Sequence, residues 1–451
     1  MASSTSQSAI ETRRRGSSGA FIFRALSHRN YQLFFAGQSI SLIGTWMTRI
    51  ATSWLVYRLT GSALLLGVVG FAGQIPSFVL APLAGVLVDR WNRHRLLVAT
   101  QILALLQSLA LALLTLTGVI KIWHVIALSV FQGLINAFDM PARQAFVVEM
   151  VDRREDLANA IALNSSMVNA ARLLGPSIGG VVIAGVGEGW CFMTDAISYL
   201  AVIASLLAMT ISSRMTRPAK DARIFAQLYE GWTYATRFTP IRDILILLAV
   251  VSLVGMPYSV LMPVFANDIL RGGPSTLGWL MAASGVGALA GALLLAARKS
   301  VLGLGKYIPF MAAAFGVGLI AFSFTRVTWL ALLLMMVTGL GFMVQMAASN
   351  TVLQTIVDED KRGRVMSFYT MAFMGTAPFG SLLAGSVADR IGTPHTLLFG
   401  GIGCVLGALW FATSLPALRR EVKPIYVKIG VLPEVAEGIH QTSELSVPPE
   451  T

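Results

Sequence analysis

The sequence predicts an all-α membrane protein in which twelve transmembrane helices form two pseudo-symmetric six-helix bundles. The first observation is composition, because 55% of the 451 residues are hydrophobic and only 12% are charged, whereas a soluble domain carries about 25% charged residues. The second is the recurrence of apolar runs long enough to cross a bilayer, which takes about 20 residues per helix. The third is the position of the cations, which lie mainly in the short breaks between these runs.

Twelve apolar spans follow one another along the chain and are separated by short charged or polar breaks. If both termini lie on the cytoplasmic side, 26 of the 34 Lys and Arg residues fall on that side and five lie in the loops on the other. The positive-inside rule predicts this asymmetry, and removing one span would destroy the alternation. The predicted spans are 31–58, 64–88, 95–118, 122–148, 157–186, 190–211, 243–269, 275–297, 304–325, 328–356, 363–388 and 394–415.

The spans group into two halves joined by a charged linker. The segments VDRREDLANAIALNSSM, from Val151, and VDEDKRGRVMSFYTMAF, from Val357, stand at equivalent places in the two halves; a chance likeness between two charged loops is the alternative. Repeated halves with a binding site between them are typical of secondary transporters, and the N-terminus lacks the pattern of a signal peptide. We expect a basic cytoplasmic tail at 1–30, helical bundles at 31–211 and 243–415, a cytoplasmic linker at 212–242 and a cytoplasmic tail at 416–451.

The charged stretch GVLVDRWNRHR, which begins at Gly85, separates the second and third spans and fits the pattern G-x-x-x-D-R-x-x-R. In the fifth span ARLLGPSIGG is similar to G-x-x-x-G-P-x-x-G-G, with Ala171 in place of the first glycine. With twelve spans, these motifs make residues 25–415 resemble the major facilitator superfamily. FQGLINAFDMPARQAF and GTWMTRIATSWLVYRLTGS resemble its branch of enterobactin exporters and related efflux proteins. The matching motif positions are Gly85, Asp89, Arg90, Arg93, Gly175, Pro176, Gly179 and Gly180.

The resemblance implies a role for each motif. The loop implies a latch that holds the cytoplasmic gate shut in the outward-open state, with Asp89 at the positive end of the eleventh span and Asp139 relaying charge to Arg93. A topological anchor is the alternative for the loop, and a simple ion pair with Arg143, one turn away, is the alternative for Asp139. The fifth-span motif implies helix bending, because proline leaves one carbonyl without its helical donor; a static kink is the alternative.

Polar side chains spaced three, four or seven residues apart share one helix face, and such stripes follow several spans. A stripe either lines a wet cavity or hydrogen-bonds to a neighbouring helix, and an arginine in the stripe favours the cavity. Arg172, near the middle of the fifth span, is the first candidate for binding an anionic or electron-rich substrate group. Arg49 and Asp195 lie at similar depths, so an ion pair between them is plausible, with a structural or a proton-coupling role. The other candidates for substrate or proton coupling are Arg143, Gln38, Asn136 and Gln345.

The sequence predicts no cofactor, metal or catalytic site. GLGK, from Gly303, departs from the phosphate-binding loop because Tyr307 replaces the required Ser or Thr. The five histidines are scattered, and the two cysteines show no metal-ligand spacing. The net charge of +12 belongs to the loops between spans and does not indicate a nucleic-acid surface. We expect a protein that is not an enzyme and that binds no nucleic acid.

These observations favour a secondary active exporter of small amphipathic molecules, siderophore-like or drug-like, that works by alternating access and is driven by protons. Its expected partners are the substrate, protons and membrane lipid, and it is expected to act as a monomer in the inner (cytoplasmic) membrane. Some drug antiporters carry an arginine where Ser129 stands, so here either Arg143 or Arg172 takes that role or the coupling works differently. An importer of a small metabolite and a non-transporting membrane sensor or scaffold are the alternatives.

Overall fold

The computed structural model describes residues 24–151, 153–210, 233–298 and 300–428. Within these ranges all regular structure is helical, so the predicted all-α fold class is correct. Most of the expected tail at 1–30, and parts of the linker at 212–242 and of the tail at 416–451, lie outside the described residues.

The first six spans form one bundle, and their helices begin and end within a few residues of the predicted boundaries. Two short 3-10 turns, η1 (Arg24–Ser27) and η2 (Arg154–Asp156), precede the first and fifth of these helices. The six helices are α3 (Arg29–Thr60), α4 (Ala63–Arg90), α5 (Arg93–Leu116), α6 (Ile122–Met150), α7 (Leu157–Val186) and α8 (Glu188–Leu207).

The last six spans form the second bundle, in which two spans are not uniform α-helices. The seventh span consists of α10 (Thr239–Val250), the π-helical turn η3 (Val251–Gly255), α11 (Tyr258–Val264) and the π-helical turn η4 (Phe265–Ile269). The eleventh consists of α15 (Glu359–Thr370), the π-helical turn η5 (Met371–Gly375) and α16 (Ala377–Ile391). The remaining helices are α12 (Pro274–Ala296), α13 (Leu304–Phe324), α14 (Thr328–Ile356) and α17 (Thr393–Lys428).

The described residues contain eleven helical segments that are long and apolar enough to cross a membrane. The first span, α3, is not among these eleven and brings the number of bundle helices to twelve. It is 32 residues long and packs against α7 and α8, but Arg49 and several Ser and Thr residues lower its hydropathy. α3 is therefore a helix of the first bundle despite its lower hydropathy, and its polar residues are expected to have a role inside the bundle.

Local capping defines the helix ends that carry the loop motif. The Asn92 side chain accepts a hydrogen bond from the Arg95 backbone N–H at 2.9 Å and so caps α5. At the other end of α4, Ser62 accepts from the Leu65 backbone N–H at 3.3 Å, immediately after Gly61 turns the chain with φ of 60°. The short α3–α4 and α4–α5 connections keep α3, α4 and α5 antiparallel in one bundle.

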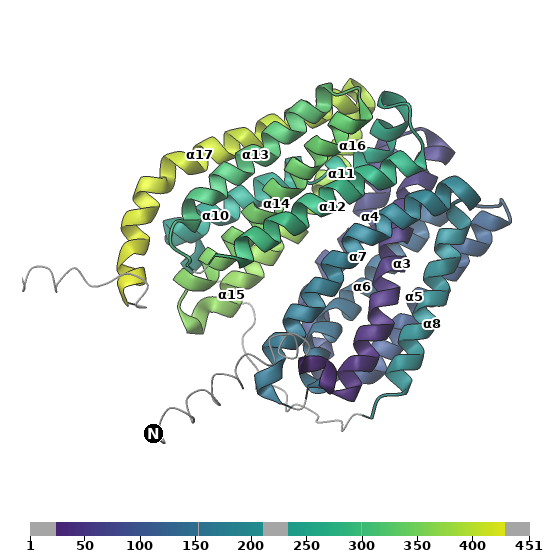
Figure 1. The fold of residues 1–451 in the computed structure, drawn as a ribbon, viewed down its shortest axis with the longest axis horizontal. Helices are drawn as coiled ribbons and strands as arrows, with labels where there is room; N and C mark the ends of the chain where they lie inside the picture. The colour runs from purple at the N-terminus through teal and green to yellow at the C-terminus, as the bar shows by residue number, and fades with distance from the viewer. Residues whose placement is uncertain (1–23, 152, 211–232, 299, 429–451) are drawn as a thin grey trace, which may run out of the picture.

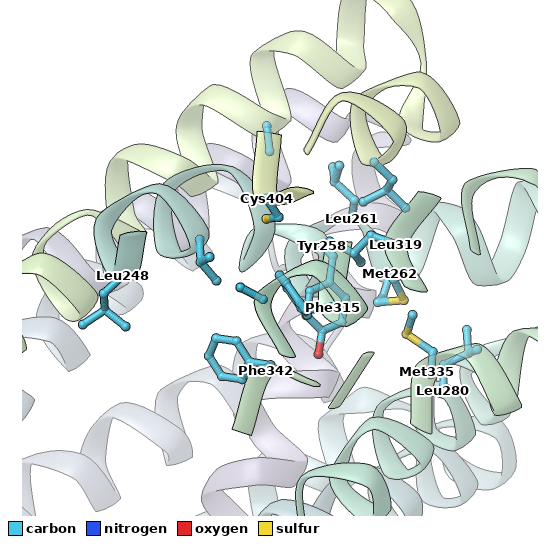
Figure 2. Packing of buried hydrophobic residues seen from close by; sticks show 14 of the residues in the cluster. Leu248, Tyr258, Leu261, Met262, Leu280, Phe315, Leu319, Met335, Phe342 and Cys404 are labelled. Atoms are coloured by element: carbon cyan, nitrogen blue, oxygen red, sulfur yellow. The ribbon is translucent and has the colours of Figure 1, made fainter. Parts of the chain in front are cut away.

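The second bundle is held together by an apolar core in which aromatic rings from neighbouring helices meet. Figure 2 shows Phe315 close to Tyr258 and Phe342, and the ring centroids lie 6.1 and 5.5 Å from that of Phe315. The Tyr258 hydroxyl is hydrogen-bonded to that of Ser284 at 2.8 Å, which satisfies its polar atom inside the core. The second bundle thus has a packed core in which buried polar atoms are hydrogen-bonded.

The two bundles meet mainly along two pairs of helices, with smaller contacts from α11 to α3 and α4. Figure 1 shows α3 to α8 on one side and α10 to α17 on the other, with α4 beside α16 and α7 beside α12. The bundles come together near the end where α16 stops and separate toward the end that carries α15. This arrangement leaves the surfaces between the bundles as the place to look for a site.

Candidate functional site

Glycines bring the two bundles into backbone contact between α7 and α12. A Cβ atom at Gly180 would lie 2.9 Å from the Cα atom of Gly278 and 2.8 Å from the carbonyl oxygen of Pro274. A Cβ atom at Gly278 would lie 2.7 Å from the carbonyl oxygen of Pro176. No side chain fits at either position while the helices stay this close.

The contact between α4 and α16 repeats this arrangement at symmetry-equivalent positions. A Cβ atom at Gly67 would lie 3.0 Å from the Cα atom of Gly385 and 2.5 Å from the carbonyl oxygen of Ser381. Gly67 and Gly278 each stand four residues after the start of their helix, and Gly385 and Gly180 each stand six residues before the end. The four glycines form two equivalent seals, one on each side of the pseudo-twofold axis.

Polar contacts join the bundles at the same end. The Tyr57 hydroxyl donates a hydrogen bond to Asp268, and the Ser62 hydroxyl donates to Asp389 at 3.5 Å. We call this end, defined by the four glycines and these two contacts, the closed end. At the opposite end of α4 nothing lies within 4 Å of the position that a Cβ atom of Gly85 would take. We call that end, where the α4–α5 loop lies, the basic end.

Two arginines and a tryptophan form a cluster between the bundles. The guanidinium carbon of Arg49 lies 4.6 Å from the ring centroid of Trp46, and that of Arg172 lies 5.8 Å from it. Arg49 is surrounded by protein, yet its side chain is exposed, so it faces an internal opening and not the outer surface. The Arg172 side chain is half-buried, and the expectation that both arginines line a wet opening stays a prediction.

Small residues of the fifth-span motif make room for this cluster. A Cβ atom at Gly175 would lie 2.4 Å from the Cβ atom of Trp46, and one at Gly179 would lie 3.2 Å from the Cα atom of Met47. Gly180 points the other way, to α12, and Pro176 is buried within a helix that stays continuous. In this structure the motif acts as a two-sided packing surface, and its predicted role in helix bending remains a prediction.

The cluster lies below the closed end at equal depth on both helices. Arg49 is eight residues from Tyr57 along α3, and Arg172 is eight residues from Gly180 along α7. At 1.5 Å per residue both arginines therefore lie about 12 Å from the seal. A ligand in contact with them is separated from the closed end by roughly two helical turns of packed protein.

The Arg49–Asp195 ion pair suggested by the sequence is not formed. Asp195 is 1% exposed and accepts a hydrogen bond from the Ser108 hydroxyl at 2.8 Å. The α3 residues next to this carboxyl group are Gly44, whose Cβ atom would lie 2.8 Å from it, and Thr48. Arg49 is one residue further along, which rotates it about 100° away toward Trp46. Residues at similar depth on two helices pair only if both side chains face each other, and here Asp195 faces Gly44 and Thr48 of α3.

Asp139 and Arg143 form the intrahelical ion pair that was the simpler of the two alternatives. The same carboxylate accepts hydrogen bonds from the Thr100 hydroxyl at 2.9 Å and the Gln101 amide at 2.8 Å. The relay from Asp139 to Arg93 implied by the resemblance is wrong for this conformation. Arg93 instead pairs with Glu149 at 2.8 Å, because Glu149 stands near the end of α6 next to the start of α5.

Asp139→Leu is expected to lower the stability of the folded protein by about 3–5 kcal/mol, because it leaves the partly buried Arg143 without its partner. Thermal unfolding of the purified protein in detergent measures this loss. The double variant Asp139→Leu with Arg143→Met removes both charges and is expected to recover most of the loss. Equal melting temperatures for the wild type and the single variant would contradict an energetic role for the pair.

The remaining predicted residues fall in two groups. Arg90 is exposed at the basic end, while the side chain of Asp89 is outside the described part of the structure. Gln38 and Gln345 are 3% and 0% exposed, so the expectation that they line an opening is wrong for this conformation. They lie in the packed interiors of their bundles. Asn136 is half-buried and accepts a hydrogen bond from the Gln132 amide at 3.2 Å.

Several residues of the site were not anticipated from the sequence. Trp46 gives no polar signal, and of the four sealing glycines only Gly180 was named, for helix bending. A small-xxx-small pattern, Ala63 to Gly67 and Ser381 to Gly385, precedes two of the others and could have flagged them. The described residues contain no group of His, Cys, Asp and Glu suited to a metal ion.

The fold and site define a class. Twelve helices in two pseudo-symmetric bundles, sealed together at one end with charged groups between them, are the architecture of major facilitator superfamily transporters. The family model described as "Transmembrane secretion effector" (MFS_3) matches residues 21–432, and the chain belongs to this family of the superfamily.

Relatives and solved structures agree with this assignment. The chain is 27% identical to the staphyloferrin A transporter of Staphylococcus aureus, over 86% of this chain and 97% of the relative. It is 30% identical to the multidrug efflux pump Tap of Mycolicibacterium fortuitum, over 84% and 93%. A bacterial homologue of the lysosomal transporter Spinster, in an inward-facing and unoccupied conformation, shares the fold with a TM-score of 0.68 and 14% identity, over 90% and 99%. The predicted superfamily and efflux branch are thus confirmed.

Proposed function

We propose that this protein is a secondary active exporter that moves small amphipathic molecules, siderophore-like or drug-like, out of the cell. The observation that carries the proposal is the arginine–tryptophan cluster between bundles that are sealed at one end only. A site reached from one side, with a seal of glycines that can separate, is what alternating access requires. The relative described as a multidrug efflux pump supports the outward direction, and the one described as a staphyloferrin A transporter supports a small-molecule substrate.

The orientation of the protein follows from its charges. The basic end carries the α4–α5 loop with Arg90 and Arg93, and the positive-inside rule assigns such loops to the cytoplasm. In this proposal the termini are cytoplasmic, the protein sits in the cytoplasmic membrane, and the structure represents the state open to the cytoplasm. The loop latch around Gly85 and Asp89 would then engage after the bundles have rocked to close the basic end.

Protons are the proposed driving ion, and Asp195 is the proposed proton-binding group. Its carboxyl group is buried in a membrane span, and no described cation pairs with it. An intramembrane carboxylate without a cation is costly in its charged form and is a functional candidate for that reason. It lies on the far side of α3 from Arg49, so proton and substrate would occupy separate places coupled through this helix.

The experiment that tests the proposal compares cells that make the wild type, Arg172→Ala or no protein. Untargeted mass spectrometry of medium and cell extracts, together with growth on a panel of toxic compounds, measures the result. We expect a compound in the medium, or a resistance, that is present with the wild type and falls at least tenfold with Arg172→Ala, since a charged hydrogen bond to substrate is lost.

Arg58→Ala is the matched control for loss of a positive charge. Arg58 pairs with Glu188 at 2.7 Å at the closed end and is far from the cluster along α3. It is expected to keep export. Accumulation of solutes inside the wild-type cells would replace the exporter with an importer, and identical profiles in all strains would refute transport of the tested compounds.

A further inference from the structure

The arginine–tryptophan cluster also specifies the charge of its ligand. We propose that the substrate is an organic anion with a planar apolar part, held by Arg49 and Arg172 around Trp46. This inference rests on the proposed function, because it names the chemical class that the exporter would carry. It narrows "amphipathic" to molecules with a carboxylate, sulfonate or phosphate group.

The positive charges of Arg49 and Arg172 are not balanced by acids of the described protein. Arginine stays protonated in proteins, and neither Arg49 nor Arg172 has a carboxylate partner among the described residues. Arg143, a third arginine inside the first bundle, does have one. Two uncompensated guanidinium groups close together repel each other and are costly inside a membrane protein. An anion in the opening between the bundles relieves both costs.

The separation of Arg49 and Arg172 suits one small anionic molecule. The guanidinium carbons of Arg49 and Arg172 lie 4.6 and 5.8 Å from one point, the Trp46 ring centroid, so they are at most 10.4 Å apart. The planar guanidinium fork matches carboxylate, sulfonate and phosphate oxygens in a two-point hydrogen bond. Two acidic groups on one small molecule, or one group shared by both arginines, fit within that distance.

Trp46 offers an aromatic surface to the apolar part of the ligand. Trp46 is half-buried and packs with its Cβ atom against α7 at Gly175. Arginine near a tryptophan face is favourable by itself, so the two arginines are held in place before a ligand arrives. A planar apolar group of the ligand gains contact area against this indole ring, whereas a purely inorganic anion does not.

The same two arginines disfavour the binding of cationic ligands. A cationic ligand at this place would meet two positive charges and no acid, which selects against it as strongly as the pair selects for an anion. A buried carboxyl group on the neighbouring helix α8, that of Asp195, accepts a hydrogen bond from Ser108 and pairs with neither arginine. The cluster therefore separates anionic substrates from cationic drugs of similar size.

The test is equilibrium dialysis of the purified full-length protein with two permanently charged probes built on the same ring system. The probes are naphthalene-2-sulfonate and trimethyl(2-naphthyl)ammonium. We expect the sulfonate to bind at least about tenfold more tightly than the ammonium ion, and Arg172→Gln and Arg49→Gln each to weaken sulfonate binding about tenfold or more. Arg172→Lys, which keeps the charge but not the fork, is expected to lose less.

Arg58→Gln is the control, because it removes a cation from the same helix outside the cluster. Unfolding curves of each variant show whether it is folded, and the lysine variant serves if a glutamine variant is not. No saturable sulfonate binding at millimolar concentration, equal binding of both probes, or unchanged binding by Arg172→Gln would overturn the proposal. If export of neutral or cationic compounds depends on Arg172, the exporter proposal holds and the anion proposal fails. If the protein binds the anion but exports nothing, the anion proposal holds and the exporter proposal fails.

Discussion

Gly180→Leu is expected to abolish export by preventing the bundles from sealing at the closed end. The added side chain would begin 2.9 Å from the Cα atom of Gly278 and 2.8 Å from a carbonyl oxygen, so only separation of α7 from α12 makes room for it. Overpacking of this kind costs about 1–3 kcal/mol. That cost shifts the equilibrium between the two conformations about 5- to 150-fold away from the state described here.

The shift is measured by cross-linking cysteines introduced at Ser62 and Asp389, whose side chains meet across the closed end at 3.5 Å. The native cysteines, Cys191 and Cys404, are buried and free, which keeps the background low. We expect the rate of cross-linking in Gly180→Leu to fall about tenfold, and export to fall with it.

Gly185→Leu is the matched control on the same helix. Nothing lies within 4 Å of the position of its Cβ atom, and the residue is exposed. The two substitutions change helix propensity and hydrophobicity equally, so only the contact with α12 distinguishes them. Full cross-linking and export in Gly180→Leu, or equal losses in both variants, would show that the glycine contact does not form the seal.

The symmetry of the two seals leads to a further expectation. Gly67 and Gly385 occupy the same helix positions as Gly278 and Gly180. Because both seals open in one rocking movement of rigid bundles, loss of either is expected to open the closed end. The movement is thus shared between two equivalent contacts and does not depend on one hinge.

The sequence was sufficient to predict what depends on hydrophobicity and charge alone. The twelve spans, the two halves and the ion-pair option for Asp139 and Arg143 follow from run length, cation placement and the i,i+4 spacing. It did not show where α10 and α15 give way to the π turns η3 and η5, because a π turn has no signature in hydrophobicity or charge.

For the candidate site too, helical spacing within one span could be predicted, whereas contacts between distant helices could not. Helical spacing correctly placed Arg49 on a polar stripe, but a stripe does not reveal which neighbouring helix it faces. Asp195 was therefore paired with Arg49 by depth alone, whereas α3 in fact turns Gly44 toward it. Trp46 became part of the site only because Gly175, over a hundred residues away in the chain, lets α7 approach it.

Asp195→Asn is expected to uncouple transport from the proton gradient. The amide keeps the size of the carboxyl group and can still accept from Ser108, but it cannot gain or lose a proton. In inside-out vesicles a gradient of about one pH unit sustains up to about tenfold substrate accumulation for each proton exchanged. The variant is expected to equilibrate substrate and to accumulate none.

The control must separate loss of a proton site from loss of any carboxylate, and Glu188→Gln does so. Glu188 lies at the start of the same helix, α8, and is also buried, but it has its own partner in Arg58. We expect this variant to accumulate substrate as the wild type does, because Glu188 pairs with Arg58 at the start of α8 and takes no part in the proposed proton site. Accumulation by Asp195→Asn that still follows the pH gradient would assign the proton to another group. Since Asp195 of α8 contacts α3 at Gly44 and Thr48 while Arg49 leaves α3 on a different face, coupling between proton and substrate would in either case have to pass through movement of that helix, and not through direct contact.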